Sequence, residues 1–116
     1  MANSDDINNK IEDAHQTAQA SLNKAFLVRD QSDAAMNAYM TLLDASNSLY
    51  LADLEAALSS SALAQALAVI SAATTTLTTI ASHMTDATSI ISGATNFANQ
   101  AQVVITAYQG AQKAIG

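Results

Sequence analysis

Residues 59–79 read SSSALAQALAVISAATTTLTT, three serines followed by an uncharged stretch in which leucine, isoleucine and valine recur at helical spacing. Serine competes for backbone hydrogen bonds and often begins a helix, so the serines predict a turn at 59–61. The lack of charge extends over residues 56–116, which contain one acid, Asp86, and one base, Lys113. The chain therefore divides at the serines into a charged half and a neutral half.

The composition predicts one all-α domain spanning residues 1–116. The chain has no proline, only three glycines and no cysteine, and alanine, the strongest helix former, is abundant. A formal net charge of −6 argues against nucleic acid as a partner. The lack of cysteine excludes disulfides and thiolate chemistry.

Two segments bear on where the protein acts. The N-terminal sequence MANSDDINNKIED has neither a basic nor an apolar region, so we expect no secretory signal peptide. Cytoplasmic assembly and signal-independent export both remain open.

Residues 56–81 carry no charge over a length that can cross a bilayer. Gln65 and the threonines within 74–79 make this stretch only weakly apolar, so we do not expect a constitutive transmembrane helix.

The first half predicts one long amphipathic helix over about residues 4–58. Asn3 and Ser4 are types that cap helix N-termini, and acids at positions 5 and 6 suit the first turn. Apolar or small residues then recur at close to the period of an α-helix. This row contains Ile7, Ile11, Ala14, Ala18, Leu22, Ala25, Val28, Ser32, Met36, Tyr39, Leu43, Ser46, Tyr50, Leu54 and Ala57.

The second half predicts a helix of similar length over about residues 62–115, with an apolar row close to the coiled-coil period. Folding the chain at Ser60 would place Met36 against Met84 and Leu43 against Leu77. We therefore expect a long antiparallel two-helix hairpin, coiled-coil-like and about 80 Å long. If the helices break instead at 44–48 (DASNS) and 88–93, the same rows predict a compact four-helix bundle.

The neutral half favours a contact surface. A helix face exposed to water normally carries lysine and glutamate, whereas this half offers small neutral side chains that a partner can approach without stranding a charge. A two-helix hairpin also leaves most of its surface uncovered. We predict an interface made of Leu63, Leu67, Val69, Ile70, Thr75, Leu77, Thr78, Ile90 and Val103.

One group of residues suggests chemistry. His83 and Asp86 lie three positions apart on one helical face, and the hairpin would bring Asp33 opposite them. A histidine among carboxylates is typical of a proton switch or a metal ligand, although a polar edge beside the helix seam explains the same pattern. No nucleophile–base arrangement, phosphate-binding glycine loop or metalloprotease motif is present. We therefore predict no enzyme activity, cofactor, small-molecule substrate or metal.

These features favour a structural protein that assembles with itself, or with a related helical subunit, into an oligomer, filament or ribbon-like array. Two alternatives belong to other classes. The first is a secreted or toxin-associated hairpin that inserts its neutral half into a membrane, and the second is a small adaptor or chaperone for a partner helix.

Overall fold

The structure is a computed structural model that describes residues 4–55 and 63–115. It contains helices α1 (Ser4–Val28), α2 (Asp33–Glu55), α3 (Leu63–His83) and α4 (Ala87–Ile115), with a 3-10 turn, η1 (Arg29–Gln31), between the first two. These described residues include no β-strand. The all-α class predicted from the composition is confirmed.

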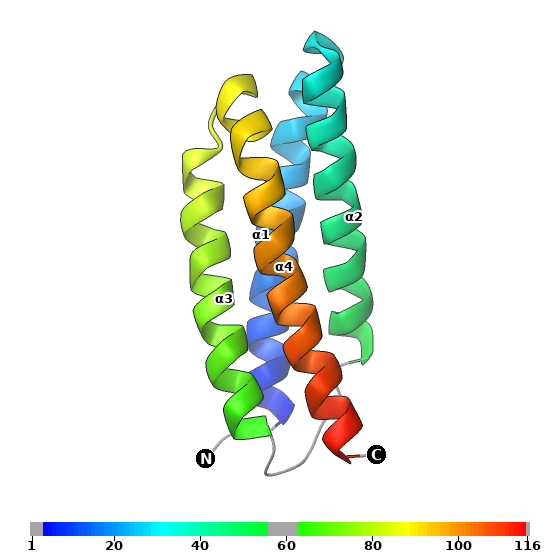
Figure 1. Cartoon of the computed structure of the whole chain (residues 1–116), viewed down its shortest axis with the longest axis vertical. Helices are drawn as coiled ribbons and strands as arrows, with labels where there is room; N and C mark the ends of the chain where they lie inside the picture. The colour runs from blue at the N-terminus through cyan, green and yellow to red at the C-terminus, as the bar shows by residue number, and fades with distance from the viewer. Residues whose placement is uncertain (1–3, 56–62, 116) are drawn as a thin grey trace.

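The helices form a rod-shaped bundle measuring 47 × 21 × 17 Å along its principal axes. α1 packs against α2 and α3 packs against α4, and the two helical pairs lie side by side with α1 next to α3 and α2 next to α4 (Figure 1). The pairs α1–α4 and α2–α3 therefore occupy opposite corners. The helices run alternately up and down, so α1 begins and α4 ends at the same end of the bundle.

The arrangement is the compact four-helix bundle and not the long hairpin. The hairpin would have paired α2 with α3 along their length, whereas these helices lie at opposite corners. Each long helix expected from the sequence is folded in half, with breaks at 29–32 and 84–86. The predicted turn at 59–61 lies outside the described residues. A bundle buries more apolar surface than a single two-helix seam, which favours the compact form.

The first break depends on Ser32. The backbone of Ser32 is extended, with φ −166° and ψ 166°, and its Oγ accepts a hydrogen bond of 3.1 Å from the backbone N–H of Ala35. The carbonyl of Ser32 also accepts from the N–H of Met36 at 3.0 Å. Ser32 is therefore the N-cap of α2, where its side chain satisfies a donor that the helix leaves unpaired.

The second break spans residues 84–86, and the two breaks proposed for a bundle, 44–48 and 88–93, are instead helical within α2 and α4. The range 88–93 ends at Gly93. A Cβ at Gly93 would lie 3.0 Å from Cγ of Met84. This glycine thus allows α4 to pass close to the Met84 side chain at the α3–α4 turn, and it does not end a helix.

The core contains many alanines, which let the helices approach closely. On α1 the buried row begins with Ile7, Ile11, Ala14 and Ala18, as the sequence predicted. On α2 the buried row is displaced by one position, because the break at 29–32 resets the helical phase. Its apolar members are Ala35, Ala38, Leu42, Ala45, Leu49 and Ala52, and Ser46 of the predicted row is buried beside them.

Candidate interaction surfaces

Three residues of the predicted interface belong to the bundle core. Ile70, Leu77 and Ile90 are buried among the four helices, so they are not available to a second chain in this fold. Leu67 is half-buried and packs against the same core. Leu63 begins α3, and its side chain lies outside the described part of the structure. For Ile70 and Leu77, periodicity identifies an apolar row without saying which neighbour covers it. For Ile90, the predicted row passed through Ile91, and the break at 84–86 shifts the phase of α4 so that Ile90 is buried and Ile91 is exposed.

Thr75 and Thr78 lie on the α1 side of α3. They line a groove between the two helices together with Thr74 and the α1 residues Lys10 and Asp13. The hydroxyls of Thr75 and Thr78 donate to the carbonyls one turn earlier, at 3.0 and 3.1 Å. These threonines therefore satisfy their own hydroxyls locally, and their groove is polar and charged on the α1 side.

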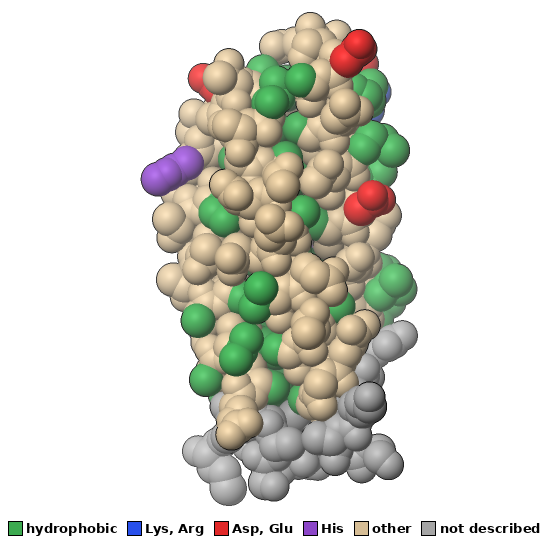
Figure 2. All heavy atoms as spheres, in the orientation of Figure 1, with side chains coloured by type: hydrophobic (Ala, Val, Ile, Leu, Met, Phe, Trp, Pro, Cys, Tyr) green, Lys and Arg blue, Asp and Glu red, His purple; other side chains and the backbone are tan. Residues whose placement is uncertain are grey.

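Val69 lies on the opposite side of α3, where α3 meets α4, and Val103 lies on α4 beside it. They are 45% and 39% exposed, and they line an open hollow of about 380 Å³ between the two helices. We call this hollow the neutral groove, lined by Val69, Asn99, Gln102, Val103, Thr106 and Ala107. The face that holds α4 and α3 is largely tan and green in Figure 2, with red and blue confined to its edges.

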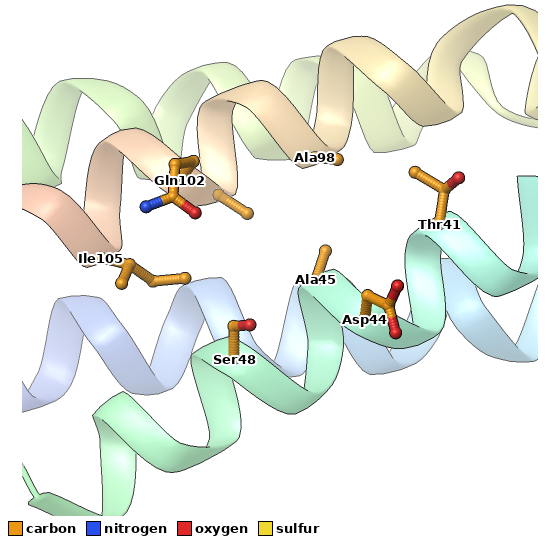
Figure 3. A pocket seen from close by; sticks show the side chains of 8 residues that line it. Thr41, Asp44, Ala45, Ser48, Ala98, Gln102 and Ile105 are labelled. Carbon is orange, nitrogen blue, oxygen red and sulfur yellow. The ribbon is translucent and has the colours of Figure 1, made fainter.

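A second hollow lies on the other side of α4, where α4 meets α2. It measures about 250 Å³, and alanines from both helices, including Ala45 and Ala98, point into the space between them (Figure 3). Asp44 and Gln102 stand at its rim. Gln102 lines this second hollow as well as the neutral groove, so the two hollows lie on either side of one ridge of α4.

The largest set of exposed apolar side chains is on α2, in the acidic half of the chain. We call it the α2 stripe, made of Met36, Met40, Tyr50, Leu51 and Leu54. Leu51 and Leu54 are 57% and 63% exposed. Figure 2 shows green side chains along the edge over α2 with red acidic groups among them. Three members of the stripe were predicted to lie in the core, and the displaced phase of α2 puts them outside.

The residues of the predicted pH-sensitive cluster do not form one site. Asp33 begins α2 and His83 ends α3, and these helices occupy opposite corners of the bundle. All three side chains, including that of Asp86, are exposed. Within the described residues, no three histidine, aspartate or glutamate side chains are grouped so that they could hold a metal ion.

Asp86 instead caps α4. Its Oδ1 accepts hydrogen bonds of 2.9 Å from the backbone N–H and from the hydroxyl of Ser89. The Ser89 hydroxyl oxygen in turn accepts from the N–H groups of Thr85 and Asp86, at 2.8 and 3.0 Å. The backbone N–H bond, and then the hydroxyl bond, hold the pKa of the Asp86 carboxyl below its ordinary value. A lowered pKa means that the cap stabilises the fold above the ordinary carboxylate range, and that this contribution is lost as the pH falls through the lowered value.

Replacing Ser89 with alanine is expected to raise the pKa of Asp86 towards its ordinary value, because the hydroxyl bond is lost while the backbone bond remains. The free energy of unfolding should also fall, because the hydroxyl no longer accepts from the N–H groups of Thr85 and Asp86 at the start of α4. NMR titration and urea unfolding measure the two effects. Ser92→Ala is the control, since that hydroxyl donates only to the carbonyl of Ser89. An unchanged pKa in Ser89→Ala would contradict the cap.

Two clusters of polar and aromatic side chains lie where α1 packs against α2. Nδ1 of His15 lies 3.5 Å from Oδ2 of Asp53, and its ring is 5.3 Å from that of Tyr50. At the other end of the pair, the Arg29 guanidinium of η1 lies 3.8 Å from the centre of the Phe26 ring of α1 and 5.5 Å from that of the Tyr39 ring of α2. These residues lie on α1, η1 and α2, so we assign the contacts to helix packing.

Within the part of the chain that the structure describes, no helix has the length and apolar character needed to cross a membrane. Comparison of the chain with protein-family models, with characterised proteins and with solved structures gives no match. The function proposed below is therefore based on the surfaces described above.

Proposed function

We propose that this protein is a structural subunit that assembles with copies of itself through the neutral groove. The observation that supports this function is the uncharged face over α3 and α4, in which an open, largely apolar hollow interrupts a surface of small neutral residues. From residue 56 onwards the chain has a single acid and a single base. This face therefore contributes few ionised groups of its own that a covering subunit would remove from water, which is the main cost of burying a charged surface.

The distribution of charge supports the same function. Residues 1–55 contain nine acids and three bases, so α1 and α2 supply the repulsion that keeps separate subunits soluble. A neutral face does not supply that repulsion. Surfaces without charge promote association, and here the uncharged part is concentrated on one side of the bundle. We therefore expect subunits to associate through this one side of the bundle and not to aggregate through all of their surfaces.

The test places charge in the groove. Val69→Glu with Val103→Glu should convert an assembled protein into monomers, because two carboxylates would be buried without partners in the contact. Both side chains are partly exposed in the monomer, so the fold itself should survive. Light scattering after size-exclusion chromatography gives the mass, and circular dichroism checks the helix content.

The control adds the same charge elsewhere. Asn9→Glu with Ala20→Glu changes two exposed residues of α1, a helix that contributes to neither the neutral groove nor the α2 stripe. This control should retain the mass of the wild type. A wild type that is monomeric at every concentration tested would contradict self-assembly, and equal disruption by the control would mean that total charge is responsible.

A second function rests on the same hollow. The neutral groove is open and lies between two helices, a shape that also suits one helix of a different protein. An adaptor of this kind would be monomeric alone and would form a stoichiometric complex with its partner. The mass of the purified wild type separates the two functions.

A further inference from the structure

The side chains of α2 are distributed in an unusual way. Its buried row is made mainly of alanine, whereas the exposed α2 stripe consists of methionine, leucine and tyrosine. Burying the larger apolar side chains would give the greater stabilisation. The closely packed bundle accepts the small row, so the larger row remains on the surface. Exposed apolar rows of this length on a soluble bundle mark contact sites.

Charge restricts what can cover the stripe. Asp33 and Asp44 lie on the same side of α2 as Met40 and Leu51, since residues three, four and seven apart share a helix face. Two α2 stripes placed together would bring four of these carboxylates into one contact, which opposes pairing of the stripe with itself. The neutral groove offers an apolar surface without acids, so the stripe can enter it without this repulsion.

The groove is shorter than the stripe and can hold part of it. The stripe is a single ridge of side chains along one helix, and from Met36 to Leu54 it is about 27 Å long at 1.5 Å per residue. The neutral groove lies between two antiparallel helices, and its α4 lining from Asn99 to Ala107 is about 12 Å long. The ridge of one helix packing into a groove between two others is a common form of helix association. The groove would hold the middle of the stripe, around Met40 and Leu51.

We infer that the α2 stripe of one copy docks in the neutral groove of the next copy. This inference rests on the proposed self-assembly and adds the partner surface. The groove lies where α3 meets α4, whereas the stripe is on the outer side of α2, at the corner opposite α3. The contact therefore joins two different surfaces of identical chains. A contact of this kind is heterologous and leaves a free stripe at one end and a free groove at the other, so it extends into a ring or a filament.

Mixing two blocked variants tests the inference. Met40→Glu with Leu51→Glu blocks the stripe and leaves the groove intact, and Val69→Glu with Val103→Glu blocks the groove and leaves the stripe intact. Each variant alone should be monomeric. An equimolar mixture should form a 1:1 dimer that grows no further, because one intact stripe and one intact groove remain. Sedimentation velocity measures all three samples, with the Asn9→Glu and Ala20→Glu chain as the control that assembles like the wild type.

The outcomes separate the inference from the proposed function. If the stripe variant assembles like the wild type while the groove variant does not, the groove pairs with another surface, and only the inference is overturned. A mixture that stays monomeric also overturns it, since a heterologous contact requires complementation. If the wild type itself is monomeric, the proposed function fails. A monomer that captures a cationic amphipathic peptide through the stripe would assign this surface to a different partner and would likewise overturn the inference.

Discussion

Replacing Phe97 with alanine is expected to lower the free energy of unfolding by about 3–5 kcal/mol, the range for removing a fully buried phenylalanine. The Phe97 side chain has no exposed surface and lies in the core cluster. Much of the remaining core is alanine, so the apolar contacts are concentrated on a few large side chains. Small domains are stable by only about 5–15 kcal/mol in total. The substitution should therefore remove a large fraction of the stability.

Urea unfolding followed by circular dichroism measures this effect. It should be carried out in the Val69→Glu and Val103→Glu background, so that any assembly does not contribute to the apparent stability. Asn96→Ala is the matched control, because this neighbouring side chain is exposed and its loss should change stability by less than about 0.5 kcal/mol. Equal effects of the two substitutions would show that Phe97 does not lie in a packed core.

Replacing Leu77 with aspartate is expected to unfold the chain or to leave it with little stability. Leu77 has no exposed surface in the bundle, and an aspartate there would be a carboxylate without a partner in an apolar core. The group avoids the full cost by becoming protonated, but the penalty is still several kcal/mol. That penalty is comparable to the whole stability of a domain of this size.

This substitution also distinguishes a core position from an interface position. In an interface between chains, Leu77→Asp would produce a folded monomer, whereas in the core it should produce an unfolded one. Thr79→Asp is the control, since Thr79 is exposed on the same helix and a charge there remains in water. Helix content and NMR peak dispersion report the difference. A well-dispersed spectrum for Leu77→Asp would contradict the buried position.

The charge pattern of the sequence was sufficient to indicate where the neutral surface lies. Val69 and Val103 were predicted to lie in an interface because they fall off the main apolar row, and both are partly exposed beside one hollow. Ile70, Leu77 and Ile90 belong to the core instead. The α2 stripe was not predicted as a surface, because its residues follow the same helical period as a buried row.

The sequence by itself determined that the chain is helical, that α1 buries the row starting at Ile7 and Ile11, and that the net charge is confined to the first half. These properties depend on local propensity, periodicity and composition. Only the tertiary structure decided where the long helices break. The chain has no proline, and its helices end at two polar caps, Ser32 and the Asp86–Ser89 pair. Such caps end a helix only when the bundle formed by folding the chain back buries more apolar surface than one continuous helix would. The breaks in turn set the phase of α2. Both of its rows have a helical period, and close helix packing selects the alanine row for the core, which leaves the methionines and leucines outside.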